Sequence, residues 1–249
     1  MVAGHQPFAA IAILFLPLPA IESVPYILGG AAFHVGYQLF LALSYRTGDL
    51  SQVYPIARGS APVIVTLVSV FVLGVSLSGM ELAAVALIAV GIMSLAIVRD
   101  HDSERNYQAA AFALMTGFFI AGYSLLDGLG ARLAGNALSF WGWLSVVNAL
   151  VYFPIVETLR PGITRDVMAN HRKTALIVGS ASFIAFAMVI WAFTQAPIAL
   201  VTALRETSIV FALMIGTTFF RERLGIQKAT ATVVALAGVV LLRVSSLAG

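Results

Sequence analysis

The sequence has no cysteine and few charged residues. Without cysteine, the chain has no disulfide, thiolate metal ligand or cysteine nucleophile. Charged residues make up only 10% of the chain, whereas a soluble domain carries about 25%. A glycine-rich phosphate loop, a paired-histidine metal motif and a low-complexity tail are also missing from the sequence. An ordinary soluble domain is therefore excluded, and no cofactor or metal site is expected.

Long apolar runs take the place of these features. Hydrophobic residues make up 60% of the chain, and the mean hydropathy is +0.98. Nine apolar segments span 8–20, 24–45, 51–74, 78–98, 107–131, 136–157, 173–194, 197–220 and 226–245. All but the first reach the ~20 residues that a membrane helix needs. Helices are favoured over strands because a spanning segment must satisfy its own backbone hydrogen bonds. The predicted fold class is an all-α polytopic membrane helix bundle.

An internal repeat divides the chain into two related halves. Ser51-Gln-Val-Tyr-Pro-Ile-Ala-Arg58 aligns with Ile198-Ala-Leu-Val-Thr-Ala-Leu-Arg205, so an arginine in an apolar run recurs 147 residues later. The register then continues without a gap and matches Leu77 to Leu224, Ala84 to Ala231, Gly91 to Gly238 and Leu95 to Leu242. The first repeat is predicted within 1–100 and the second within 101–249, together forming one integral membrane domain.

The two copies are expected to run in opposite directions. Segments 51–74 and 197–220 match each other but lie five crossings apart. Because five is odd, the copies cross the membrane in opposite senses, which is the inverted-topology repeat of many secondary transporters.

The fifth segment, 107–131, has no match in the first half. Counting back 147 residues places its partner before Met1, so about nine helices of a ten-helix plan are expected, with the first helix absent. The Thr116–Asp127 face of segment 107–131 should contact certain segments of the bundle. A groove is expected beside the repeat-related counterparts of those segments, where the absent helix would lie.

Basic residues are unequally divided between the two sets of loops. One set holds ten of them, namely Arg46, Arg99, Arg105, Arg160, Arg165, Arg172, Lys173, Arg221, Arg223 and Lys228. The other set holds only Arg132 and Arg243. The positive-inside rule places the first set in the cytoplasm and the C-terminus outside. This distribution accounts for the pI of 9.4 without a nucleic-acid partner.

Two stretches resemble a known family of membrane proteins. Tyr54-Pro-Ile-Ala-Arg-Gly-Ser-Ala-Pro62, followed by an apolar run to Leu73-Gly74, resembles the helix-four signature of the EamA-like drug/metabolite transporter superfamily. Ala203-Leu-Arg-Glu-Thr-Ser-Ile-Val-Phe211, Arg221-Glu-Arg-Leu224 and Gly238-Val-Val-Leu-Leu242 resemble the matching end of its second repeat.

The resemblance implies ten helices in two inverted five-helix repeats around a central cavity, with small organic solutes exported or imported. Three features depart from this pattern. The first helix is missing. The family's Gly-Glu-Arg-Leu turn between the last two helices of each repeat survives only as Arg221-Glu-Arg-Leu224, and the first copy reads Gly74-Val-Ser-Leu77. Both termini of family members usually lie in the cytoplasm, which conflicts with the charge distribution.

Arg58 and Arg205 are the first candidates for a site. Each lies seven or eight residues inside its segment, or roughly 10–12 Å deep at 1.5 Å per residue. Burying an arginine there costs at least ~2.5–3 kcal/mol, so each should have a partner. A salt bridge to Glu206 or Asp127 and direct contact with a solute are both open interpretations.

Proline residues flank Arg58. Pro55 and Pro62, together with Gly59, are expected to kink or locally unwind this helix, because proline removes a backbone donor. The freed carbonyls would either bind a solute or cation or simply accompany a bend in a packed helix.

Polar residues at helical spacing mark further inward faces. They are His34, Tyr37, Gln38 and Tyr45; Thr116, Tyr123 and Asp127; and Trp141, Ser145, Asn148 and Tyr152. Such residues either line a cavity or hydrogen-bond one helix to another. The predicted substrate cavity comprises Arg58, Arg205, Glu206, Tyr54, His34, Tyr37, Gln38, Tyr123 and Asp127. For His34, protonation is one alternative and a structural role is the other. Trp191 is expected to be an interface anchor.

The favoured function is a secondary transporter of the inner (plasma) membrane that moves a small organic solute by alternating access. Its expected partners are solute and membrane lipid, with a homodimer as an open possibility. The alternatives are a polytopic membrane enzyme and a non-transporting assembly subunit. An intramembrane protease using Gly122-Tyr-Ser124 fails because the later histidine, His171, lies in a charged loop.

Overall fold

Every regular element in the described part of the chain is a helix. The computed structural model describes residues 1–48, 50–94, 107–208 and 226–248. Its elements are α1 (Val2–Phe15), the 3₁₀ helix η1 (Ile21–Ser23), α2 (Val24–Thr47), α3 (Leu50–Phe71), α4 (Gly79–Ser94), α5 (Tyr107–Leu133), α6 (Ala137–Leu159), α7 (Ile163–Asn170), α8 (Arg172–Gln195), α9 (Ile198–Arg205) and α11 (Ile226–Ala248). The all-α prediction is confirmed.

Five helical stretches in the described residues are long and apolar enough to cross a membrane. They are Ile21–Thr47, Val53–Phe71, Tyr107–Leu133, Ala137–Leu159 and Arg172–Gln195. Shorter apolar helices cover Val2–Phe15, Gly79–Ser94 and Val233–Leu242. The protein is therefore a multi-pass helix bundle.

The structure differs from the sequence expectations at several points. The expected loop 158–172 contains the short helix α7, which no apolar pattern marks because its side chains are largely exposed. Helix α3 continues across Pro55 and Pro62 without unwinding, so a kink or bend in a packed helix is the alternative that stays a prediction. The expected segment 197–220 is interrupted, since α9 ends at Arg205. The Arg221–Leu224 turn lies outside the described residues.

Two compact units emerge from the contacts of the chain. Unit 1 comprises Met1–Val35 and Tyr123–Ala196, and unit 2 comprises Gly36–Gly122 and Pro197–Gly249. The long helices α2 and α5 each contribute one part to each unit. Because these units combine parts of both sequence halves, the division into repeats near residue 100 stays a prediction.

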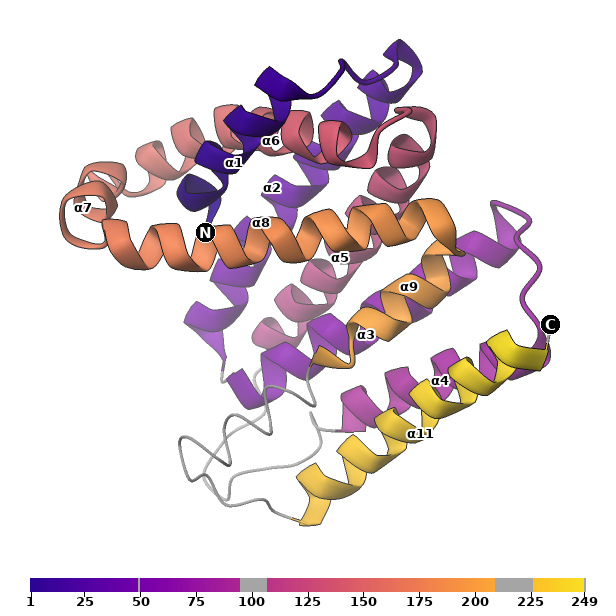
Figure 1. Ribbon diagram of the computed structural model, residues 1–249. Coiled ribbons are helices and arrows are strands. Elements are labelled where there is room, and N and C mark those ends of the chain that lie inside the picture. Colours follow the sequence, from indigo (N-terminus) through magenta and orange to yellow (C-terminus); the bar gives the residue numbers. More distant parts are fainter. Residues whose placement is uncertain (49, 95–106, 209–225, 249) are drawn as a thin grey trace. The chain divides into compact units, whose positions relative to one another are not determined.

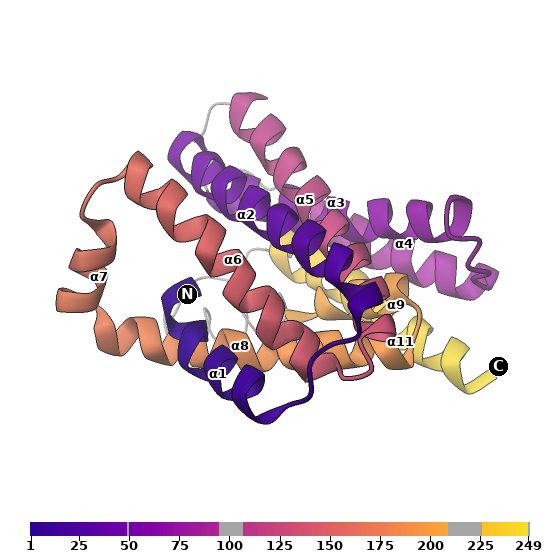
Figure 2. The ribbon, with the colours of Figure 1, turned by 90° about the horizontal axis from the view of Figure 1, so that it is seen from above.

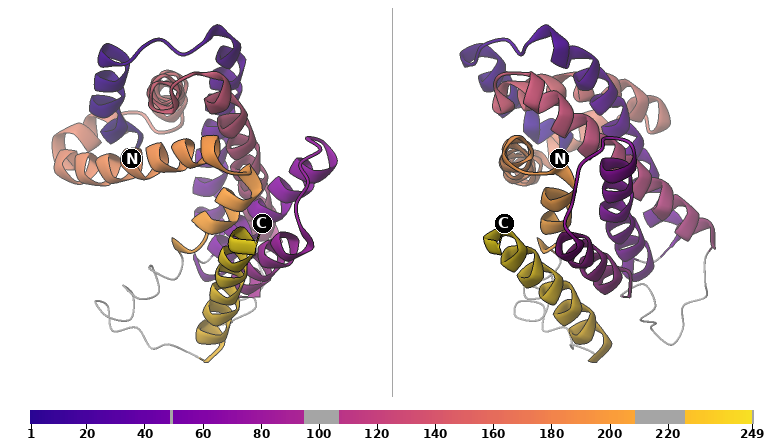
Figure 3. Two further views of the ribbon diagram at one scale, coloured as in Figure 1. Left: turned by 45° about the vertical axis from the view of Figure 1, so that its right-hand side comes forward. Right: turned by 90° about the vertical axis from the view of Figure 1, so that its right-hand side faces the viewer.

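Unit 1 is built around helices α1, α6 and α8, which contact one another (Figure 3). Small residues allow the close approach. A Cβ on Gly4 would lie 2.7 Å from the Cα of Gly179, and a Cβ on Gly142 would lie 2.8 Å from the Cβ of Ala12. Helix α7 contacts α6 and α8 and joins their ends (Figure 2).

In unit 2, the matched helices α4 and α11 lie side by side (Figure 1). A Cβ on Gly91 would lie 2.7 Å from the backbone nitrogen of Ala235 and 3.0 Å from the carbonyl oxygen of Ala231. A Cβ on Gly238 would lie 2.8 Å from the carbonyl oxygen of Ala84 and 2.9 Å from the backbone nitrogen of Ile88. Both glycines are thus required by close contact with a backbone.

These contacts are reciprocal in the register of the repeat. Gly91 matches Gly238, and its neighbour Ala231 matches Ala84, which is in turn the neighbour of Gly238. Such an exchange of equivalent contacts is the signature of a two-fold relation. As the residue number rises along α4 from Ala84 to Gly91, the contacted residue falls along α11 from Gly238 to Ala231. The matched helices are antiparallel, as an inverted repeat requires.

Candidate functional site

Helix α3 carries Arg58 into the apolar interior of unit 2. The residue lies eight positions after the first residue of the helix, which corresponds to about 12 Å of rise. Pro62 occupies the position whose amide would bond the Arg58 carbonyl oxygen in an uninterrupted helix. The site therefore combines a fixed positive charge with a proline that cannot donate the usual helix hydrogen bond to the same residue.

Helix α9 brings Arg205 to a break in the helix. The amides of Glu206 and Thr207 bond the carbonyl oxygens of Ala203 and Leu204, at 3.1 Å each. These short-range bonds tighten the last turn, and the helix ends at Arg205. A basic residue in the last turn complements the negative end of the helix dipole. A discontinuous helix beside a charged group is a recurrent element of transporter binding sites.

The two arginines share one carboxylate. The Nε of Arg58 lies 3.0 Å from Oε2 of Glu206, and the Nε of Arg205 lies 3.5 Å from Oε1. The Glu206 side chain is only 1% exposed, whereas Arg58 is 22% and Arg205 is 11% exposed. The salt bridge to Glu206 expected for these arginines is confirmed, and the alternative partner Asp127 is paired elsewhere. We name Arg58, Arg205 and Glu206 the arginine cluster.

Further polar groups extend the arginine cluster. Arg58 donates through Nη2 to the Ser208 hydroxyl at 3.1 Å, and its guanidinium carbon lies 5.6 Å from the centre of the Tyr54 ring, within cation–π distance. Tyr37 lies within electrostatic range of Arg58, Arg205 and Glu206. Arg58, Arg205, Glu206, Tyr54 and Tyr37 are therefore brought together.

Gln38 is the remaining predicted cavity residue that lies in unit 2. Its Oε1 is buried and has no hydrogen-bond partner among the described residues. Tyr45, two turns further along α2, is partly exposed but lies within electrostatic range of Tyr37, Tyr54 and Arg58.

The arginine cluster is not symmetric with respect to the repeat, because only the second copy carries a carboxylate next to its arginine. The repeat register matches Glu206 to Gly59, where a Cβ would lie 3.3 Å from the backbone nitrogen of Met93 in α4. Close helix packing therefore excludes a second glutamate at the matching position. The three side chains carry two positive charges and one negative charge, and an arginine stays protonated at any physiological pH.

Unit 1 contains a separate buried cluster. The Nε2 of His34 in α2 lies 2.8 Å from Oδ2 of Asp127 in α5, and the two side chains are 5% and 0% exposed. The His34 ring stacks on Tyr123, with 4.1 Å between centroids and an interplanar angle of 15°. The structure thus joins three residues that the sequence placed on separate helix faces. We name His34 and Asp127 the histidine–aspartate pair.

The sequence does not reveal this pairing, although the polar residues on both helix faces can be identified in it. The only signal in the sequence was that an Asp at membrane depth requires a partner, and the sequence offered Arg58 and Arg205 as well. Ser208 was also missed, because a serine after a helix break carries no distinctive pattern. In the described part of the chain, no three His, Asp or Glu side chains converge in a way that could hold a metal ion.

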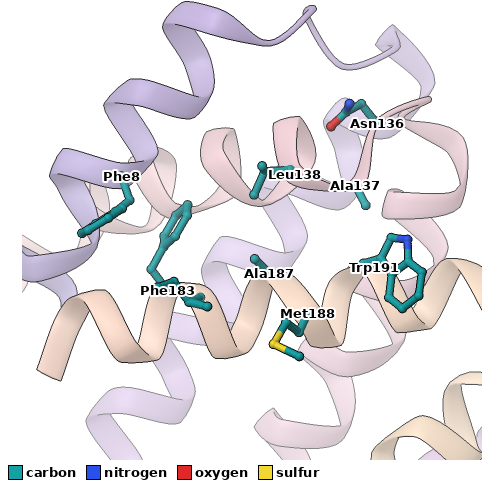
Figure 4. Close-up of a pocket in the computed structure, with 9 residues that line it drawn as sticks. Phe8, Asn136, Ala137, Leu138, Phe183, Ala187, Met188 and Trp191 are labelled. Carbon is teal, nitrogen blue, oxygen red and sulfur yellow. The ribbon is translucent and has the colours of Figure 1, made fainter.

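A groove of about 590 Å³ lies between α1, α6 and α8 in unit 1 (Figure 4). Its lining is almost wholly apolar and consists of Phe8, Asn136, Ala137, Leu138, Phe183, Ile184, Ala187, Met188 and Trp191. Trp191 is largely exposed and lines this groove, so its expected role as an interface anchor stays a prediction. A smaller polar pocket that contains Arg132 adjoins the groove and shares Asn136, Ala137 and Trp191 with it.

The groove lies where the repeat predicts one. Counting by 147 residues, Ala187 and Trp191 match Phe40 and Ser44 of α2. Phe40 stacks on Phe119 of α5, and Ser44 lies 3.4 Å from the Thr116 hydroxyl. The groove on α8 is therefore the counterpart of the surface that α5 covers on α2.

A scan of protein-family models assigns a family to this bundle. The model described as the EamA-like transporter family matches residues 108–244, more than half of the chain. The chain belongs to the EamA-like transporter family. Membership makes it a multi-pass membrane transporter and implies a small-molecule solute and contact with lipid, and the predicted resemblance is confirmed.

Comparison with solved structures supports the fold of this EamA-like chain. One structure, described only as the crystal structure of a protein, aligns with a TM-score of 0.68 and 14% identity over 96% of this chain and 92% of its own. At this identity the likeness concerns the fold alone. No curated protein sequence matches the chain.

Proposed function

We propose that the chain is a secondary transporter that moves a small organic anion, most simply a carboxylate, by alternating access. The observation that carries this proposal is the arginine cluster. Two arginines at matched positions of the repeat meet one buried carboxylate in unit 2.

The charge of the arginine cluster favours an anionic solute. Its three side chains sum to a net positive charge, and both arginines are more exposed than Glu206. A planar guanidinium can bind a carboxylate through two parallel hydrogen bonds, which gives geometric selectivity as well as attraction. Tyr54 and Tyr37 supply hydroxyl groups and aromatic surface for the organic part of such a solute.

The backbone supports alternating access. Antiparallel packing of the matched helices α4 and α11 is the relation expected of repeats that rock against each other. The break after Arg205 places a helix end beside the arginines, while the matched helix α3 is continuous. A helix end changes its backbone angles more readily than a continuous helix, so α9 is the proposed moving side.

Transport into lipid vesicles tests this proposal. Purified protein is reconstituted, and the uptake of radiolabelled solutes is measured in matched pairs, each pair being a small carboxylate and its uncharged amide. We expect a carboxylate to enter and its amide to be excluded. Equal entry of both members, or entry of no carboxylate, would overturn the proposal.

Variants assign the selectivity to the arginines. Arg58→Gln and Arg205→Gln should abolish carboxylate uptake, whereas Arg58→Lys, which keeps the charge, should retain part of it. Arg165→Gln is the matched control because Arg165 is exposed on α7. Size-exclusion chromatography checks that each variant remains folded. Uptake by folded Arg58→Gln and Arg205→Gln at the wild-type rate would remove the arginines from the site.

The proposed location is the inner membrane, with the segments 99–106, 158–172 and 221–228 facing the cytoplasm. The loop charges support this orientation. Because the chain has no cysteine, a single cysteine at Thr164, exposed on α7, can be tested with a membrane-impermeant thiol reagent. Protection in intact cells supports the orientation, and ready labelling reverses it.

A further inference from the structure

The histidine–aspartate pair is a buried ionisable group that the arginine cluster does not use. His34 and Asp127 lie in unit 1, on helices α2 and α5, with 2.8 Å between Nε2 and Oδ2. Gly30 makes room for the carboxylate, since a Cβ there would lie 2.7 Å from Oδ1 of Asp127. The carboxylate therefore occupies a space that any other residue at position 30 would fill.

The chemistry of the histidine–aspartate pair suits it to carry a proton. A neutral imidazole donates from Nε2 to the carboxylate, and the pair then has a net charge of −1. If a proton from water binds the second ring nitrogen, the imidazolium keeps the same hydrogen bond and the net charge becomes zero. Both states retain the hydrogen bond, and the protonated state carries no uncompensated charge into the membrane interior. An imidazole is also the side chain that ordinarily changes charge near neutral pH.

The surroundings of the pair hold few other ionisable groups. Tyr123 of α5 stacks on the His34 ring, and His5 of α1 is within electrostatic range. Helices α6 and α8 present Trp141 and Phe186 to His34, with centroid distances of 5.9 and 5.8 Å, and neither side chain titrates. A proton bound here is thus held by His34 and Asp127 within an aromatic enclosure.

We propose that the histidine–aspartate pair is a proton-binding site and that one proton is taken up and released there in each transport cycle. This inference rests on the proposed transport function for its coupling, but not for proton binding itself. The helices offer a physical link, because α2 and α5 both continue from the pair into unit 2. A change in the hydrogen bond between them alters two elements that both units share.

Proton binding can be measured without any solute. Protonated imidazole quenches indole fluorescence, and the His34 ring lies 5.9 Å from the Trp141 ring. Trp143→Phe and Trp191→Phe leave Trp141 as the sole tryptophan of the three. Its emission in detergent is recorded from about pH 5 to 8, where an imidazole ordinarily titrates. We expect one reversible transition that is absent in His34→Gln and shifted in Asp127→Asn.

Two histidine controls identify the titrating residue. His5 also lies near Trp141, at 5.7 Å, so His5→Gln must retain the transition. His171 is exposed between α7 and α8, and His171→Gln should change nothing. A transition that persists in His34→Gln and disappears in His5→Gln would overturn the proposal. The lack of any transition in the single-tryptophan protein would also overturn the proposal. This outcome does not depend on whether the further histidine and aspartate variants fold.

Vesicles loaded with a transported carboxylate then test coupling. At zero membrane potential, a gradient of one pH unit should drive about tenfold accumulation if one proton moves with each solute. Both directions of the gradient are tested. His34→Gln and Asp127→Asn should lose the accumulation, measured as the ratio of the solute level reached with the gradient to the level that the same variant reaches without it. Accumulation at the wild-type level in folded variants would show that the pair does not couple proton movement to transport. The proposed function would still hold in that case, as long as the protein exchanges the carboxylate. Without any uptake, the fluorescence titration alone decides the proton site.

Discussion

Unit 2 contains two interfaces between matched helices of the repeat, one between α4 and α11 and one between α3 and α9. Only the first of them keeps the symmetry of the repeat. Between α4 and α11, Gly91 and Gly238 make equivalent contacts on opposite helices. Between α3 and α9, Arg58 and Arg205 are equivalent by register, but both contact the single carboxylate of Glu206. The backbone interface retains the two-fold relation, and the charged cluster does not.

This difference separates a packing requirement from a chemical one. Two copies of one helix pack well when small residues recur, because each copy meets the same surface. A symmetric pair of buried glutamates would instead neutralise both arginines and remove the net positive charge. We interpret the loss of symmetry at Glu206 as the feature that allows the arginine cluster to attract an anion.

The largest expected effect comes from the asymmetric residue. Glu206→Gln leaves two arginines close together in an apolar unit, which should destabilise the protein by about 3–5 kcal/mol. Thermal unfolding in detergent and the yield from membranes measure this loss. Glu22→Gln is the control because Glu22 is exposed. An unchanged unfolding temperature in Glu206→Gln would show that the carboxylate does not hold the arginines.

The two arginines should differ, although the repeat makes them equivalent. Arg58 has the shorter ion pair, the Ser208 hydrogen bond and the Tyr54 ring, whereas the Arg205 ion pair is longer. Arg58→Gln should therefore cost about 1–2 kcal/mol more than Arg205→Gln in unfolding free energy. Equal losses in denaturant unfolding would restore the symmetry that the contacts lack.

The two glycines should behave alike. Gly91→Ala and Gly238→Ala each push a methyl group against the backbone of the other helix, which should cost about 1–3 kcal/mol apiece. Gly79→Ala is the matched control, since a Cβ there has nothing within 4 Å. A large difference between the two glycine variants in thermal unfolding would contradict the reciprocal contact.

The smallest effect is expected at Ser208. Ser208→Ala removes one hydrogen bond from Arg58 but leaves the ion pair. A partly exposed bond of this kind is worth about 0.5–1.5 kcal/mol. Denaturant unfolding should show a small loss in the wild-type background and none in Arg58→Gln. A loss that persists in Arg58→Gln would assign Ser208 another role.

Much of the site could be predicted from the sequence because its parts are rare in membrane segments. An arginine in an apolar run demands a carboxylate, and Glu206 and Asp127 were the two candidates. The sequence did not decide between them, because the choice depends on which helices lie side by side. The structure pairs Glu206 with both arginines and Asp127 with His34.

The prolines left two alternatives open for a related reason. Pro55 and Pro62 predicted either local unwinding or a bend in a packed helix. The structure excludes only the unwinding, because α3 is continuous, whereas α9, which has no internal proline, ends at Arg205. Proline weakens only local hydrogen bonds, and neighbouring helices can hold such a helix in place. The end of α9 results from bonds of the Glu206 and Thr207 amides that no residue pattern announces.

The sequence by itself determined the helical class, the membrane setting and the register of the repeat. Each of these depends on the apolarity and spacing of residues along one chain, because a membrane segment must satisfy its own backbone. Only the tertiary structure decided which charges meet, where a helix ends and that α4 packs directly on α11. These outcomes depend on distances between residues far apart in sequence, which packing sets and local pattern does not encode.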